Sequence, residues 1–479
     1  MTRTHTPPCT RTLVALGVMS CLLGCSGSAS SGGLPSPRLP LTRAPEEAFR
    51  RTPPPTPEAP PLHAPDMTEV QLPNGLTLVT IPRPGWPTVS VGVMTRASDL
   101  DYEEGALHLA TAYIARATVI REPDTDLSSG SALGGAGVAG TVQTRDLEDV
   151  LTALADAIHA PLVNEAMQQA RAELLREEEM SSTSPLGLGR AYATDALYTV
   201  GPTFGALHRQ RYRAVAGISP PIVSVVARDA FRPSVTAVLL VGDITAERAR
   251  ALVEPRFGAA YTERPGQRRS VPPANEATIP VGMQAMRSSQ LQLVYGLPSP
   301  DLSAPDWAAY QVLEAVLAGG FTSSLNTRVR HELGASYGVR WGSWIAAPGR
   351  AAFIEARLDG DQALNALYAF FAELGRVRSG PLPEAELTRA RGVVWGDWEA
   401  SFAAPSGLLG IYERAFMARI TVAELAERIN ATRRVTATEV LNVARARLDP
   451  ARNVVVLTGP LEALRGHQVV RTPEGFVVH

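Results

Sequence analysis

The chain repeats one pattern of strand, turn and helix at an interval of about 200 residues. In the first copy, the alternating strand Val89–Met94 runs into Ser98-Asp99-Leu100 and then into an apolar helical segment. In the second copy, the strand Leu291–Val294 runs in the same way into Pro300-Asp301-Leu302 and another apolar helical segment. A period this long indicates two homologous domains and excludes a solenoid of short repeats.

The two copies also end alike, in an apolar strand that a glycine terminates. These strands are Thr236–Gly242 and Asn453–Gly459. Near the start of the first copy, Asn74-Gly75 stands between two short apolar runs and predicts a β-hairpin, because both residues tolerate positive φ. We therefore expect an α+β fold of two homologous domains. Each should have a mainly antiparallel sheet packed with helices, and the two should form a clam-like pair.

The N-terminus has the features of an export signal. A charged start is followed by the apolar stretch Leu13–Leu23 and by Cys25. This stretch is too short to span a bilayer, and residues 1–25 resemble a bacterial lipoprotein signal peptide with lipidation at Cys25. The alternative is an ordinary secretory signal with a chance cysteine. All three cysteines lie in this leader, which leaves the body without thiol chemistry. We expect an envelope protein anchored by lipid to a membrane, and Ser26 favours the outer membrane of a Gram-negative bacterium.

Composition divides the remaining chain. Residues 26–66 are rich in serine and glycine and then in proline, which predicts a stiff, solvated tether that buries nothing. The N-terminal domain then covers 67–262, a polar linker covers 263–278, and the C-terminal domain covers 279–479. The 45 basic and 47 acidic side chains leave a net charge of −2, which excludes a nucleic-acid-binding surface as the dominant feature.

Several short segments, in a fixed order, suggest a family. Together with the doubled order of strand, helix and final apolar strand, they resemble the pitrilysin/insulinase family of zinc peptidases, which includes the mitochondrial processing peptidase subunits. The segments are Leu72-Pro73-Asn74-Gly75-Leu76, Gly105-Ala106-Leu107-His108-Leu109, Leu317-Ala318-Gly319-Gly320-Phe321, Thr322-Ser323-Ser324-Leu325, Arg330, Leu333-Gly334 and Tyr337.

The resemblance implies a zinc motif that this chain has lost. Active members carry H-x-x-E-H on the first helix, where two histidines one turn apart bind zinc and the glutamate is the general base. The matching stretch here is His108-Leu109-Ala110-Thr111-Ala112. Ala112 replaces the second histidine and Thr111 replaces the glutamate, and neither side chain can do the missing work near neutral pH.

The third zinc ligand of the family is a glutamate on a later helix, and its best match is Glu177. Glu177 lies among other acids, so a solvated charged face is the favoured interpretation of this helix. His108 and Glu177 would supply two ligands, whereas catalytic zinc needs three and an open position. We therefore expect no metal and no other cofactor. Without a metal, His108 is interpreted as a hydrogen-bonded helix histidine.

A second site of the family is retained. In active members an arginine and a tyrosine seven residues apart hold substrate, and Arg330 and Tyr337 have this spacing. A guanidinium and a phenol hydroxyl can donate hydrogen bonds to peptide carbonyls. The alternative is a surface arginine and a half-buried tyrosine beside a glycine turn. The Gly-rich segment Ser128–Gly140 stands where the family has a substrate-pairing strand, and this apparent replacement argues against peptide binding.

These features favour a catalytically inactive homologue. The leading hypothesis is a subunit that binds a peptide or an unfolded protein segment and forms a heterodimer with a zinc-bearing paralogue. The first alternative is a scaffold lipoprotein that uses the same fold. The second is an active metallopeptidase whose site is assembled from distant segments.

Overall fold

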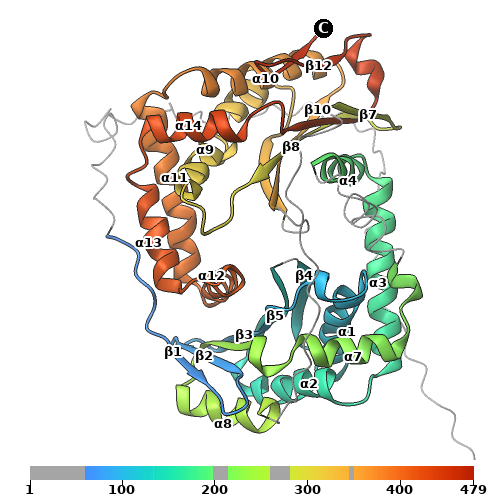
Figure 1. The fold of residues 1–479 in the computed structure, drawn as a ribbon, viewed down its shortest axis with the longest axis vertical. Helices are drawn as coiled ribbons and strands as arrows, with labels where there is room; N and C mark the ends of the chain where they lie inside the picture. Colours follow the sequence, from blue (N-terminus) through green and yellow to red (C-terminus); the bar gives the residue numbers. More distant parts are fainter. Residues whose placement is uncertain (1–59, 133, 198–213, 259–280, 345–349) are drawn as a thin grey trace, which may run out of the picture. The chain divides into compact units, whose positions relative to one another are not determined.

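The computed structural model describes residues 60–132, 134–197, 214–258, 281–344 and 350–479 (Figure 1). The predicted signal peptide with Cys25, the linker 263–278 and most of the tether lie outside these residues. The described chain forms two larger sheets and a small C-terminal hairpin. Within the described ranges, no helix combines the length and apolar character needed to cross a membrane.

The first sheet has the strand order β1-β2-β6-β3-β5-β4. Neighbouring strands are antiparallel except β2 and β6, which are parallel. Its strands are β1 (Thr68–Gln71), β2 (Thr77–Pro82), β3 (Thr88–Thr95), β4 (Asp126–Ala132), β5 (Gly135–Gln143) and β6 (Thr236–Gly242). The helices in this half are α1 (Ala106–Arg121), α2 (Leu147–His159), α3 (Asn164–Thr183), α4 (Pro185–Leu197), α7 (Pro220–Ala230) and α8 (Ala246–Phe257).

The second sheet has the order β7-β11-β8-β10-β9, and only β7 and β11 are parallel. Its strands are β7 (Val281–Ala285), β8 (Gln290–Ser299), β9 (Val339–Trp344), β10 (Arg350–Asp359) and β11 (Val454–Gly459). The helices are α9 (Trp307–Ala318), α10 (Ala363–Ser379), α11 (Glu384–Ala403), α12 (Pro405–Ala418), α13 (Val422–Thr432) and α14 (Ala437–Arg447). The chain ends in the hairpin of β12 (Val469–Arg471) and β13 (Phe476–Val478).

The two sheets repeat one topology. The order β2-β6-β3-β5-β4 in the first is matched by β7-β11-β8-β10-β9 in the second, and the parallel pair has the same place in both. The predicted α+β class with mainly antiparallel sheets is confirmed. The predicted hairpin joins β1 and β2, and Gly75 in its turn has φ +93°. The apolar strand predicted at Thr236–Gly242 is β6, and all of its residues are buried.

The side chains of β3 alternate between two packed faces of the first sheet. Val89, Val91 and Val93 belong to the core formed with the helices of the same half. Gly92 lies on the other face, where a Cβ would be 3.4 Å from Leu409 of α12. Because α12 also packs against β5 and β6, a helix of the second half covers this face of the first sheet (Figure 1).

In the same way, a helix of the first half covers one face of the second sheet. Helix α4 of the first half packs on β8, β10 and β11, and its Ala193 and Leu197 share a core with Val294 and Val456. The Thr458 hydroxyl of β11 donates to the carbonyl of Pro185 over 2.6 Å. Each half therefore supplies one helix to the other's sheet, so neither sheet is fully covered by its own half.

One part of the predicted tether is fixed to the body. Leu62 forms two hydrogen bonds with the side chain of Asn430 on α13: its N–H donates over 2.9 Å, and its carbonyl accepts over 2.8 Å. At Leu62 the chain is therefore fixed to the body, whereas a spacer solvated along its whole length was expected for 26–66. The backbone N–H and carbonyl of Leu62 both hydrogen-bond to the side chain of Asn430. This pair of hydrogen bonds anchors the segment before β1 to the second half.

Candidate functional site

The degenerate motif lies on a helix that is buried on most sides. His108, Ala112 and Arg116 recur every fourth residue of α1 and share the face that is partly open. All three line a cavity of about 400 Å³ between α1, α3 and β4. Glu173 and Glu177 of α3 line the same cavity. The structure thus brings together His108 and Glu177, the two residues that the resemblance implied as metal ligands.

The His108 ring is hydrogen-bonded to β4. Its Nδ1 lies 3.2 Å from the Ser131 hydroxyl, which donates over 3.4 Å to the Asp99 carboxylate. This contact matches the interpretation of a hydrogen-bonded helix histidine. It also ties the strand beside the cavity to the helix that carries the motif.

The position of the general base has no catalytic group. Thr111 is fully buried, and its hydroxyl donates over 2.7 Å to the carbonyl of Leu107 in the same helix. A threonine hydroxyl cannot accept a proton from water near neutral pH, and this one already has a backbone partner. Ala112 presents only a methyl group to the cavity.

The acids of α3 do not complete a metal site. Desolvation and the neighbouring Glu173 raise the pKa of Glu177, although Glu177 remains an exposed residue, as a solvated charged face predicts. Glu173 is paired with Arg116, whose guanidinium brings a positive charge that opposes a metal cation. Across the described ranges, no three His, Cys, Asp or Glu side chains gather in a group able to hold a metal ion.

A second cavity, of about 600 Å³, lies between the turn of β4 and β5 and the helices α9, α11 and α12. Its polar lining includes Glu314 and Glu413, and its aromatic lining includes Trp307 and Trp398. Burial raises the pKa of Glu314 to about 7, and burial also raises the pKa of Glu413. The Arg414 guanidinium lies 5.1 Å from the centre of the Trp398 ring.

This second cavity is the counterpart of the first within the duplicated fold. Helices α9 and α11 and strand β9 hold the places that α1, α3 and β4 hold in the first half. The sequence interpretation missed Glu314, although the repeat itself contained a signal: aligning Asp301 with Asp99 places Glu314 opposite Ala112. Where the first half has a methyl group, the second half has a partly buried carboxyl group.

Strand β4 runs past both cavities. Residues 126–129 line the first, whereas Gly130 and Ser131 line the second. β4 is the last strand of its sheet, and Ser128, Ser129 and Gly130 are exposed. The expectation that the Gly-rich segment Ser128–Gly140 replaces a strand is wrong, because this segment forms most of the antiparallel hairpin of β4 and β5. Edge strands leave backbone N–H and C=O groups open for pairing.

Arg330 and Tyr337 come together in a separate surface cluster with Phe321. The Arg330 guanidinium lies 4.0 Å from the centre of the Phe321 ring and 5.1 Å from that of Tyr337. Tyr337 is 76% exposed, so the alternative of a half-buried tyrosine is wrong. The Asn326 side chain bonds the backbone of Gly320 and of Val339, which holds the loop in place. None of the three clustered residues lines either cavity.

Comparison with known proteins agrees with this architecture. Residues 227–393 match a family model described as the peptidase M16 inactive domain. The resemblance to the insulinase-like M16 peptidases is confirmed. The match covers β6, the central part of the chain and α10, so the M16-like assignment rests mainly on the second half. No curated protein sequence matches the chain at a significant level.

Solved structures extend the M16-like fold over most of the chain. A protease from Helicobacter pylori is 14% identical, with a TM-score of 0.70 over 83% of this chain and 100% of that chain. A peptidase M16 inactive domain from Pseudomonas fluorescens is 18% identical, with a TM-score of 0.68 over 82% and 98%. A chain of complex III2 from Candida albicans is 14% identical, with a TM-score of 0.66 over 83% and 97%. At these identities the likeness shows the fold alone.

Proposed function

We propose that this M16-like protein is a non-catalytic subunit that binds an extended peptide segment along the open edge of β4. The observation that carries the proposal is the course of β4 past two cavities, one of which holds the degenerate metal motif. A peptide added to the edge of a sheet gains backbone hydrogen bonds whatever its sequence. Its side chains alternate in direction, so some of them can enter the neighbouring cavities.

The lining of β4 suits such a ligand. Ser128 and Ser129 are small and exposed, so they leave the edge accessible. Around the first cavity, Arg116 and Glu173 form an ion pair, and Asp126 and Glu177 leave a polar, acidic wall without aromatic side chains. Around the second, Glu314, Glu413 and the two tryptophans give a wall that is both acidic and aromatic. These differences would let the two cavities select different peptide side chains.

The cluster of Phe321, Arg330 and Tyr337 supplies a second contact. The Arg330 guanidinium contacts the rings of Phe321 and Tyr337. Its Nη1 is buried with no hydrogen-bond partner among the described residues. A peptide carbonyl is a suitable acceptor for this group. The exposed hydroxyl of Tyr337 can donate a further hydrogen bond.

Missing catalytic groups and retained binding groups support a role beside an active partner. The partner would be a zinc-bearing paralogue with intact H-x-x-E-H, and the two chains would form a heterodimer. Lipidation at Cys25 would hold the pair at the envelope, at the outer membrane of a Gram-negative bacterium. A scaffold role is the second candidate, because the same fold occurs in a chain of complex III2.

Peptide binding is tested with Arg330→Ala and Tyr337→Phe. Arg330→Ala removes the guanidinium and Tyr337→Phe removes one hydroxyl donor. For each variant we expect the affinity for a fluorescein-labelled pool of unstructured peptides to fall about tenfold, as measured by fluorescence anisotropy. Arg328→Ala is the matched control, since Arg328 lies on the same helical turn but pairs with Glu332. A scaffold would show no peptide binding, or binding that none of the variants changes.

The β4 edge is tested with Ser128→Pro and Ser129→Pro. Along a strand, successive N–H groups point to opposite sides, so one of these serines directs its N–H away from β5. Proline at that serine should abolish peptide binding and leave the fold intact, whereas proline at the other serine should weaken the pairing with β5 and lower the peptide affinity less. Equal peptide affinity in both folded variants would contradict binding at this edge.

Loss of the metal site is tested by metal analysis. We expect the purified protein to retain far less than one zinc ion per chain after dialysis. Ala112→His adds an imidazole one turn from His108 in the cavity that Glu177 also lines, so zinc retention should rise. Cleavage should remain absent because Thr111 still replaces the base. Val119→His, three turns from His108 in the same cavity, is the control. Stoichiometric zinc in the unmodified protein would contradict the proposal.

A further inference from the structure

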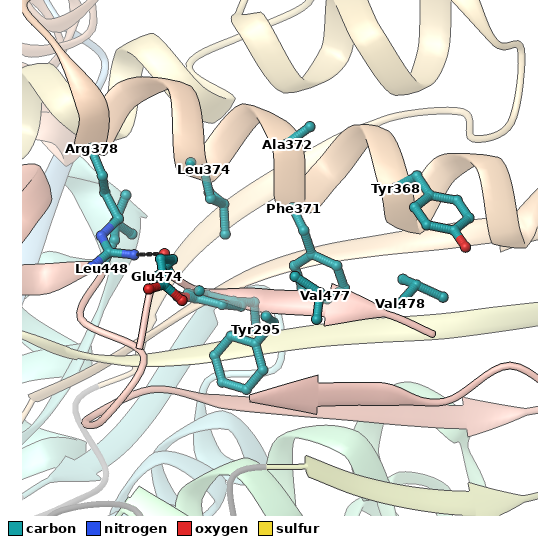
Figure 2. Close-up of a pocket in the computed structure, with 13 residues that line it drawn as sticks. Tyr295, Tyr368, Phe371, Ala372, Leu374, Arg378, Leu448, Glu474, Val477 and Val478 are labelled. Atoms are coloured by element: carbon teal, nitrogen blue, oxygen red, sulfur yellow. Dashed lines mark hydrogen bonds between the residues drawn. The ribbon is translucent and has the colours of Figure 1, made fainter. Parts of the chain in front are cut away.

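A third cavity, of about 430 Å³, lies in the second half between α10 and the C-terminal hairpin (Figure 2). On the helix, Tyr368, Phe371, Leu374 and Arg378 recur at intervals of three or four residues and therefore share one face. The hairpin forms the opposite wall and includes Phe476. Apart from Arg378, the helix wall consists of aromatic and aliphatic side chains.

Contacts between aromatic rings keep this cavity open. The rings of Phe371 and Phe476 have centroids 6.0 Å apart, and those of Phe476 and Tyr295 are 5.8 Å apart in an edge-to-face arrangement. All three residues are buried. Rings that already contact one another at favourable geometry cannot close further without losing these contacts. The cavity is therefore formed before any ligand arrives.

Arg378 is the one basic residue of the lining, and it lies at one end (Figure 2). Its Nη1 donates to the backbone carbonyl of Glu474, which fixes the guanidinium against the hairpin. Its Nε is buried and has no hydrogen-bond partner among the described residues. A buried N–H without an acceptor is unfavourable, and the guanidinium stays charged at any physiological pH.

We propose that this cavity binds a single-chain fatty carboxylate. The carboxylate would accept the hydrogen bond of Nε on Arg378, and the alkyl chain would lie between α10 and the hairpin toward Tyr368 and Val478, at the other end in Figure 2. The lining also contains one acidic residue, Glu474, which is exposed, so Arg378 supplies the buried charge that a ligand carboxylate would pair with. A volume in the lower part of the roughly 300–1,000 Å³ range of small-molecule sites limits the occupant to one chain. The inference does not depend on peptide binding at β4.

The test is a calorimetric titration of laurate into the full chain carrying Cys25→Ser, so that no attached acyl group competes. Two variants test separately the contact with the ligand carboxylate and the space for its alkyl chain. Arg378→Met removes the charge and keeps much of the side-chain length. Gly375→Leu fills the cavity: Gly375 lies in its lining, a Cβ there meets no atom within 4 Å, and leucine is the better helix former.

We expect one laurate per chain, an affinity at least about tenfold lower in Arg378→Met, and no binding in Gly375→Leu. Dodecanol, which has the same chain length without the charge, should bind as weakly as laurate binds the Arg378→Met variant. Arg389→Met is the matched control, because Nη1 of Arg389 is also buried and has no partner in the described part of the chain, but lies outside this cavity. Absent binding, or binding that persists in either Arg378→Met or Gly375→Leu, would overturn the proposal.

Discussion

Replacing Arg190 by alanine is expected to lower the free energy of unfolding by about 3 kcal/mol. Arg190 of α4 donates to both carboxylate oxygens of Glu355 on β10, over 2.5 and 2.7 Å, and Glu355 is 8% exposed. The substitution leaves that carboxylate buried without a cation opposite it. Because the Arg190 side chain is itself 34% exposed, water screens part of the interaction and keeps the loss below the largest values for buried pairs. Urea denaturation measures the difference.

The double variant Arg190→Met with Glu355→Gln serves as the control, because it removes both charges together. Its stability should return to within about 1 kcal/mol of the unmodified protein. Arg176→Ala provides a second control: Arg176 is exposed on the preceding helix and donates to a carbonyl of its own helix. A double variant as unstable as Arg190→Ala would show that the loss does not come from the unpaired carboxylate.

Glu314→Gln is expected to stabilise the protein by about 2–3 kcal/mol at pH 8 and to change its stability little at pH 4.5. Burial raises the pKa of Glu314 from 4.5 to about 7, and the nearby Asp397 adds to the shift while Gln311 opposes it. Between these two values the folded protein holds a proton that the unfolded chain releases. The contribution to stability is therefore complete below pH 4.5 and is lost as pH rises through 7. Glutamine carries no charge to lose.

Thermal unfolding from pH 4.5 to pH 8.5 measures this effect. Glu413 lines the same cavity and its pKa is also raised, so some decline with pH should remain in the Glu314→Gln variant. Glu427→Gln, an exposed change on α13, should leave the profile of the unmodified protein unchanged. Identical pH profiles for Glu314→Gln and the unmodified protein would show that ionisation of Glu314 does not cause the loss of stability as pH rises.

Much of the fold could be predicted because its strands are marked locally. The apolar run of β6, the glycine that ends it and the Asn74-Gly75 turn are properties of a few adjacent residues. The spacing of the two copies revealed the duplication in the same way. The exchange of α4 and α12 could not be predicted, because an amphipathic helix shows which side it buries but not which sheet covers that side.

Part of the candidate site could be predicted, because most of the residues in that part lie close together in the sequence. His108, Thr111, Ala112 and Glu177 were found because they match a motif with fixed spacing. Glu314 and Glu413 belong to different helices, and only the folded chain brings them to one cavity. The strand β4 was misread because glycine and serine disfavour strands, whereas the pairing with β5 decides its conformation here.

The reciprocal covering of the sheets has a consequence for biogenesis. When the ribosome has completed β6, the helix that shields the far face of β3 has not yet been synthesised, since α12 begins only at Pro405. A nascent or truncated first half therefore presents bare apolar surface, which makes it a substrate for chaperones and proteases. The two halves are therefore expected to complete their packing together, after α12 has been synthesised.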